Sequence, residues 1–66
     1  MAKKIGEVIA MLEKHGWTQV RQSGSHRHFK HLDHARMVTV AGKQSDTISV
    51  GQLADIRRKS GIKELR

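Results

Sequence analysis

The 66-residue sequence contains no cysteine, no proline and no tyrosine, and its only large aromatic side chains are one tryptophan and one phenylalanine. Without cysteine, the chain can form neither a disulfide nor a thiolate metal site. Two aromatic residues are too few for the stacking platform of an RNA-recognition sheet or an OB-fold surface. Any recognition of a nucleic acid would therefore rest on charge and shape.

The sequence also lacks a long apolar run. Its first segment, MAKKIGEVIAML, is too short and too interrupted by Lys and Glu for a signal peptide or a membrane span. We therefore expect a cytoplasmic protein that does not contact a membrane, and the absence of cysteine agrees with that compartment. No repeat or low-complexity segment is visible, and so short a chain cannot divide its core. We expect a single domain over residues 1–66.

Acidic residues are scarce beside basic ones. Thirteen Lys and Arg face six Asp and Glu, which gives a formal net charge of +7. Between Arg21 and Arg36 the chain carries four basic residues, four histidines and one acid, Asp33. A second basic cluster, near the C-terminus, consists of Arg57, Arg58, Lys59, Lys63 and Arg66. Such fields attract polyanions, although cations near a helix C-terminus are also ordinary solvated surface.

Two segments have the apolar spacing of amphipathic helices. The first covers about residues 3–15, with Ile5, Val8, Ile9 and Leu12 on one face, and Gly16 ends it in a left-handed conformation. Ser49 is the expected N-cap of the second helix, which ends at Gly61, with Ile62 making a hydrophobic contact after it.

Between the helices the period changes to two, which indicates strands. Strict alternation along the first strand, from Trp17, separates Val20 from Arg21, and Ser23-Gly24 forms a hairpin turn. The second strand covers about residues 25–32, residues 33–35 form another turn, and the third strand covers residues 36–41. We predict an α+β fold of order α-β-β-β-α, with a three-stranded antiparallel sheet and two helices on one face. The expected core consists of Val20, Phe29, Val38 and Val40 packed on Ile5, Ile9, Leu12, Leu53 and Ile56.

The second strand concentrates the titratable groups. Alternation places His26, His28 and Lys30 on one face, and Phe29 on the opposite face with Arg27 and His31. Because Phe29 is expected inside, His26 and its neighbours should face outward. His26 and His28 could both reach one metal ion. However, only Asp33 is near enough to complete the shell and a positive surface repels cations, so we expect no metal and no cofactor.

Histidine takes up and releases protons near neutral pH, which is what RNA cleavage needs. A base activates the ribose 2′-hydroxyl, an acid protonates the leaving oxygen, and positive charge stabilises the phosphate. His26 is the best candidate for the catalytic residue, because a short turn fixes its backbone. The residues expected to bind the RNA are Arg21, Ser25, Arg27, His28 and Lys30.

Other readings of the same residues stay open. The histidines could be ordinary exposed strand residues, and the chain could be a non-catalytic RNA-binding module or a structural protein that acts through a partner. QLADIRRKSGI could serve as the recognition helix of a helix-turn-helix protein. A strand and a polar loop precede it where that motif needs a helix, so this reading is disfavoured.

The segments LEKHGWTQVRQSGSHRHFKH, VTV and QLADIRRKSGI together resemble the HicA toxin family, the small ribonucleases of HicA–HicB toxin–antitoxin systems. The resemblance implies a fold like that of a double-stranded-RNA-binding domain, cleavage of mRNA, and growth arrest when the toxin is unopposed. It also implies that a HicB-type antitoxin covers the active site of a toxin that is monomeric alone. The family's catalytic histidine, in its Gly-Ser-His motif, falls on His26. Many members carry a proline after the third strand, which this chain lacks.

Overall fold

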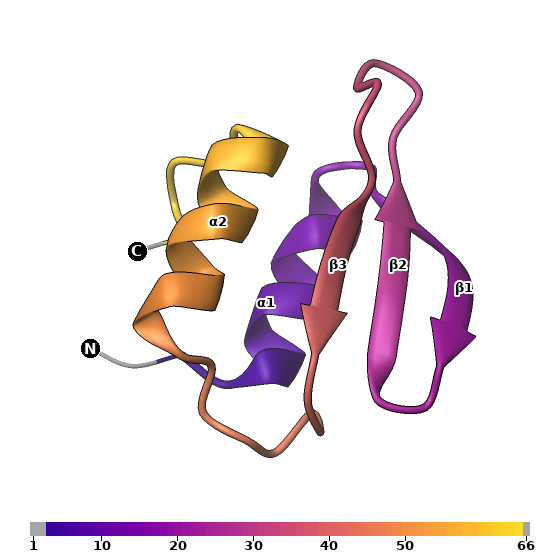
Figure 1. Ribbon diagram of the computed structural model, residues 1–66. Coiled ribbons are helices and arrows are strands. Elements are labelled where there is room, and N and C mark those ends of the chain that lie inside the picture. Colours follow the sequence, from indigo (N-terminus) through magenta and orange to yellow (C-terminus); the bar gives the residue numbers. More distant parts are fainter. Residues whose placement is uncertain (1–2, 66) are drawn as a thin grey trace.

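The computed structural model describes residues 3–65 and contains the predicted α-β-β-β-α order. The elements are α1 (Ile5–Lys14), β1 (Thr18–Ser23), β2 (His26–Lys30), β3 (Val38–Ala41) and α2 (Val50–Ser60). The strands form one antiparallel sheet in the order β1-β2-β3. Both helices lie to one side of this sheet next to β3, and β1 forms its far edge (Figure 1). The predicted α+β meander is confirmed.

The first turn of α1 finds its hydrogen-bond partners in the loop that precedes α2. The amide of Ile5 donates to the carbonyl of Asp46 at 2.8 Å, and the amide of Gly6 donates to the carbonyl of Gln44 at 3.0 Å. The first amides of a helix have no partner within it, so residues 42–49 cap α1. At its other end the chain turns at Gly16, whose φ is +90°, as expected.

Both predicted caps of α2 are confirmed. The Ser49 hydroxyl accepts a hydrogen bond from the amide of Gln52 at 3.2 Å. Gly61 is left-handed, with φ of +73°, and its amide donates to the carbonyl of Arg57 at 2.9 Å. Ile62, the next residue, is buried. The helix therefore begins and ends where its sequence directs.

The core fills the space between the helices and the covered face of the sheet. Phe29 and Val38 are fully buried there, as predicted, and Trp17 is buried too. Ile48 and Leu65 join them although neither belongs to a periodic run. The buried hydrophobic residues are Ile5, Val8, Ile9, Leu12, Trp17, Phe29, Val38, Val40, Ile48, Leu53, Ile56, Ile62 and Leu65.

The placement of Val20 in the core is wrong, since 53% of this residue is exposed. The register between β1 and β2 shifts at this point: Gln19 pairs with Phe29 and Arg21 with His28, which leaves Val20 as the extra residue of a bulge. The bulge also overturns strict alternation along β1. In addition, β1 is an edge strand whose six residues are all exposed, because the helices pack next to β3, at the other edge of the sheet (Figure 1).

The connection between β2 and β3 is longer than the predicted turn, since it covers residues 31–37. Three rings hold it against the body of the protein. The Trp17 ring lies 5.3 Å from that of His31 and 4.9 Å from that of His34, and the two histidine rings lie 4.9 Å apart, edge to face. This connection, called the 31–37 loop below, is therefore an anchored part of the fold.

Candidate functional site

The outer face of the sheet, opposite the helices, carries the titratable side chains of β2. Phe29 points into the core with no exposed surface, so its strand neighbours His28 and Lys30 point outward. Across the strands, Arg21 and Thr39 flank His28, and Thr18 lies beside Lys30. Directly paired residues share a face of an antiparallel sheet.

His26 begins β2 immediately after the turn at Gly24 and Ser25. Its imidazole is exposed and makes no hydrogen bond to any residue from 3 to 65. Its backbone is well supported, because it pairs with Ser23 on one side and with Ala41 on the other. Close by, the amide of Gly42 donates to the carbonyl of Ser25 at 3.2 Å. A free imidazole on a fixed backbone can exchange protons with a bound molecule.

Ala41, the β3 residue that pairs with His26, is itself held by a residue of α2. The Gln52 side chain spans both backbone groups of Ala41: its Oε1 accepts from the amide at 2.8 Å and its Nε2 donates to the carbonyl at 3.1 Å. This contact, which we call the Gln52 clamp, closes part of the free edge of β3. It holds the strand that pairs with His26.

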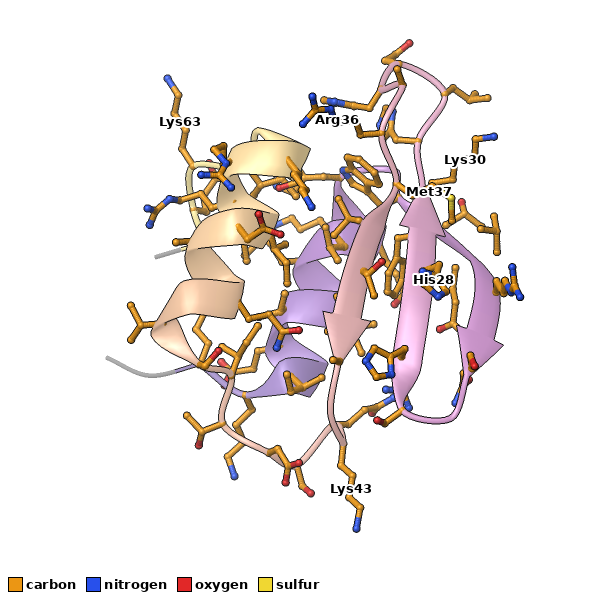
Figure 2. The ribbon with its side chains drawn as sticks, in the orientation of Figure 1. His28, Lys30, Arg36, Met37, Lys43 and Lys63 are labelled. Atoms are coloured by element: carbon orange, nitrogen blue, oxygen red, sulfur yellow. The ribbon has the colours of Figure 1, made fainter. Side chains whose placement is uncertain are left out.

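His28 differs from His26 in having a tethered ring. Its Nδ1 and the Thr39 hydroxyl share a hydrogen bond of 2.9 Å, which orients the ring, while Nε2 has no partner among the described residues. Figure 2 shows His28 on the face of β2 toward the viewer, with Lys30 further along the same strand. The two exposed groups beside it, Arg21 and Lys30, add positive charge.

Arg27 is not brought to this face. It is half-buried on the covered side of β2, and its Nη1 donates to the carbonyl of Gly42 at 3.2 Å. Ser25, in contrast, is exposed in the turn beside His26. The structure thus places Ser25 and His28 close to His26, with Arg21 opposite His28 and Lys30 at the far end of β2. Arg27 instead braces the loop after β3.

Much of the second basic cluster is engaged in α2. Asp55 pairs with Lys59 at 3.1 Å and with Arg58 at 2.8 Å. The hydrogen bond from Lys59, reinforced by Arg58, lowers the pKa of Asp55 below its ordinary value. Arg57 donates to the carbonyl of Leu65 at 3.4 Å, and Arg66 lies outside the described residues. Asp55 therefore offsets part of the positive charge of this surface, while Arg57 and Arg58 stay exposed.

The outer face can attract an anion and exchange protons with it. None of the three strands contains an acidic residue, so no carboxylate on the sheet competes for its cations. Within residues 3–65, no three His, Asp or Glu side chains are grouped to hold a metal ion. The same part of the chain has no helix long and apolar enough to cross a bilayer.

A sequence model of the HicA toxin of bacterial toxin–antitoxin systems matches residues 5–62. This chain belongs to the HicA toxin family. The matched range includes both helices and all three strands. A comparison with individually curated proteins gave no match. Membership of the family means that this HicA toxin acts in a system that pairs a toxin with an antitoxin.

Two residues of the candidate site were not singled out from the sequence. Thr39 orients His28, and its position opposite His28 depends on the register between β2 and β3. Gln52 reaches Ala41 only because α2 packs beside β3. Thr39 could have been found as a polar residue on the outer side of a predicted strand. No local feature of the sequence indicates the role of Gln52.

Proposed function

We propose that this HicA toxin is a metal-independent endoribonuclease that cleaves mRNA with His26 as a catalytic residue. The observation that carries the proposal is the exposed, unpartnered imidazole of His26 on a rigid hairpin, on a sheet face with cations and no acid. The agreement of this position with the Gly-Ser-His histidine of the family supports it further.

In the proposed reaction, the ribose 2′-hydroxyl attacks the adjacent phosphorus and the bond to the 5′-oxygen breaks. The 2′-hydroxyl gives its proton to a base, and an acid gives a proton to the leaving 5′-oxygen, so the products are a 2′,3′-cyclic phosphate and a 5′-hydroxyl. His26 fills one of these two roles. Arg21, which lies opposite His28 across the strands, balances the charge that develops on the phosphate oxygens, and Lys30 contacts the RNA backbone further from the cleaved bond.

The second proton-transfer group remains to be assigned, and His28 is the best-placed residue of the outer face. It lies two residues from His26 on the same side of β2, roughly 6.6 Å away along the strand. Its tether to Thr39 leaves Nε2 available. Either His28 exchanges the second proton or it hydrogen-bonds a phosphate oxygen, and in both cases it contacts the RNA.

The proposal includes an inhibitory partner. A HicB-type antitoxin would cover His26 and its basic neighbours, and acidic side chains on the antitoxin would complement the positive face. We expect the toxin alone to be a monomeric protein of the cytoplasm, where mRNA and an antitoxin are both present.

The test compares His26→Ala with His15→Ala, the same substitution at a histidine near the end of α1 that pairs with Glu64. Cleavage of a fluorescent RNA should fall by roughly 100-fold or more in His26→Ala, with RNA and antitoxin binding retained. His15→Ala should cleave at the wild-type rate. A wild-type protein that binds RNA but never cleaves it would instead support the non-catalytic RNA-binding module.

A further inference from the structure

An open groove of about 590 Å³ lies at the end of the sheet away from His26, where β1 begins and β2 ends beside the 31–37 loop. We call it the strand-end groove. Its apolar walls are Val20, Leu32 and Ala35, and its polar side chains include Thr18, Lys30 and His34. The mechanism proposed above uses none of the apolar walls.

The apolar walls are unusually open to solvent. Leu32 is fully exposed and Val20 is 53% exposed, and the bulge in β1 is what turns Val20 away from the core. A concave apolar surface beside a few polar groups is typical of a ligand site. The groove is therefore suited to a flat, largely apolar group with a polar edge.

His34 provides an independent indication of a ligand. Its ring is half-buried and fixed by contacts with Trp17 and His31, yet its nitrogen atoms make no hydrogen bond to any residue from 3 to 65. Both nitrogens of the neighbouring His31, in contrast, are satisfied by backbone groups. A neutral imidazole offers one donor and one acceptor, and the edge of a nucleobase offers the same.

We propose that the strand-end groove binds one nucleobase of a single-stranded RNA whose cleaved bond lies at His26; this inference rests on the proposed function. Lys30 lies on the rim, four residues along β2 from His26, which corresponds to roughly 13 Å. At about 3.4 Å or more per nucleotide, the bound base belongs to a nucleotide roughly two to four positions from the cleaved bond. Specific recognition of RNA commonly uses bases that leave the stack.

An apolar side chain of the antitoxin is a weaker fit. Such a side chain would leave the nitrogens of His34 without partners. It would also make no use of the ammonium group of Lys30, which lies on the same strand face as His26 and His28. A base joined to a phosphate backbone uses both the imidazole and the ammonium group of Lys30.

The first experiment determines which nucleotide occupies the strand-end groove. It uses a DNA oligonucleotide that carries one ribonucleotide, so that only one bond can be cleaved. The base is then removed from each neighbouring position in turn. Wild-type kcat/KM should fall by roughly 5- to 100-fold at a single position two to four nucleotides away. The double variant Val20→Ser, Leu32→Ser should cleave the intact substrate as slowly as the wild-type protein cleaves the substrate that lacks the base at this position.

Val50→Ser is the matched control, because Val50 is 87% exposed at the start of α2. Val50→Ser should keep the full difference in kcat/KM between the intact and the abasic substrates. Equal rates at every abasic position would overturn the proposal. So would a double variant that loses antitoxin binding but keeps its sensitivity to the missing base, since the groove would then belong to the protein partner.

A second measurement does not depend on cleavage. In nuclear magnetic resonance titrations, adenosine monophosphate should shift the signals of Val20, Leu32 and His34, and ribose 5-phosphate, which lacks the base, should not. If these shifts occur in a protein that never cleaves RNA, the proposed function fails and the groove stands as a base-binding site. If cleavage occurs but neither abasic scanning nor the titration shows a base effect, the groove proposal fails alone.

Discussion

His31 is held at both of its ring nitrogens by backbone groups. Nε2 lies 3.0 Å from the carbonyl of His15, which can only accept, and Nδ1 lies 2.9 Å from the amide of Asp33, which can only donate. The ring is therefore the neutral tautomer protonated at Nε2. It joins the end of α1 to the 31–37 loop, so this histidine of the sequence cluster is a structural residue.

Gly16 makes that contact possible. A Cβ atom at this position would lie 2.9 Å from Nε2 of His31, and the backbone has φ of +90°. We predict that Gly16→Ala destabilises the protein by about 2–4 kcal/mol, from left-handed strain and from the displaced ring together. Denaturant unfolding measures the loss, and the Trp17 fluorescence should change because its ring contacts His31.

Gly24→Ala separates the two causes. Gly24 also has positive φ, +59°, but a Cβ atom at this position would meet no other atom within 4 Å. The substitution should therefore cost only the strain, about 1–2 kcal/mol. Equal losses in the two variants would show that the His31 contact contributes nothing to stability.

At the scale of elements, the Gln52 clamp joins α2 to the edge of the sheet. A side-chain amide that donates to one backbone group and accepts from the other imitates a neighbouring strand. Because Ala41 also pairs with His26, the clamp connects helix packing to the position of the proposed catalytic residue.

Gln52→Met removes both hydrogen bonds while keeping a side chain of similar length. We predict a loss of about 1–2 kcal/mol in the free energy of unfolding and faster hydrogen exchange at the amide of Ala41. Gln19→Met, on exposed β1, is the control, since its amide bonds only the Gln22 side chain at 3.3 Å. Unchanged exchange at Ala41 in Gln52→Met would contradict the role of the clamp.

The elements themselves could be predicted because their signals are local. Helical spacing and the caps at Ser49 and Gly61 determine α1 and α2, and alternation about Phe29 determines which residues of β2 face outward. The prediction for Val20 was wrong because the position of this residue depends on a bulge. A bulge is set by pairing between strands and has no signature in the sequence of β1 alone. The strand-end groove could not be foreseen for the same reason, since it needs the bulge and the 31–37 loop together.

At the scale of the whole molecule, the acidic residues lie only outside the sheet, whereas basic residues lie both in the sheet and outside it. The outer face of the sheet carries Arg21, Lys30 and two histidines with no acid among the strands, whereas the acids lie on the helices and loops. Because no acid lies on the outer face, this face should attract the proposed RNA substrate before any specific contact forms.

The absence of acids from the outer face predicts how salt should weaken the proposed RNA binding. For a single strand, the slope of log K against log salt concentration falls by about 0.7 for each phosphate neutralised. Arg21→Gln should flatten the slope by about 0.7, measured by fluorescence anisotropy with an RNA oligonucleotide and the cleavage-deficient His26→Ala background. Lys14→Gln removes the same charge from the last turn of α1, in the helical layer, and should leave the slope unchanged. If both substitutions flatten it equally, RNA responds to net charge alone and the outer face is not its binding surface.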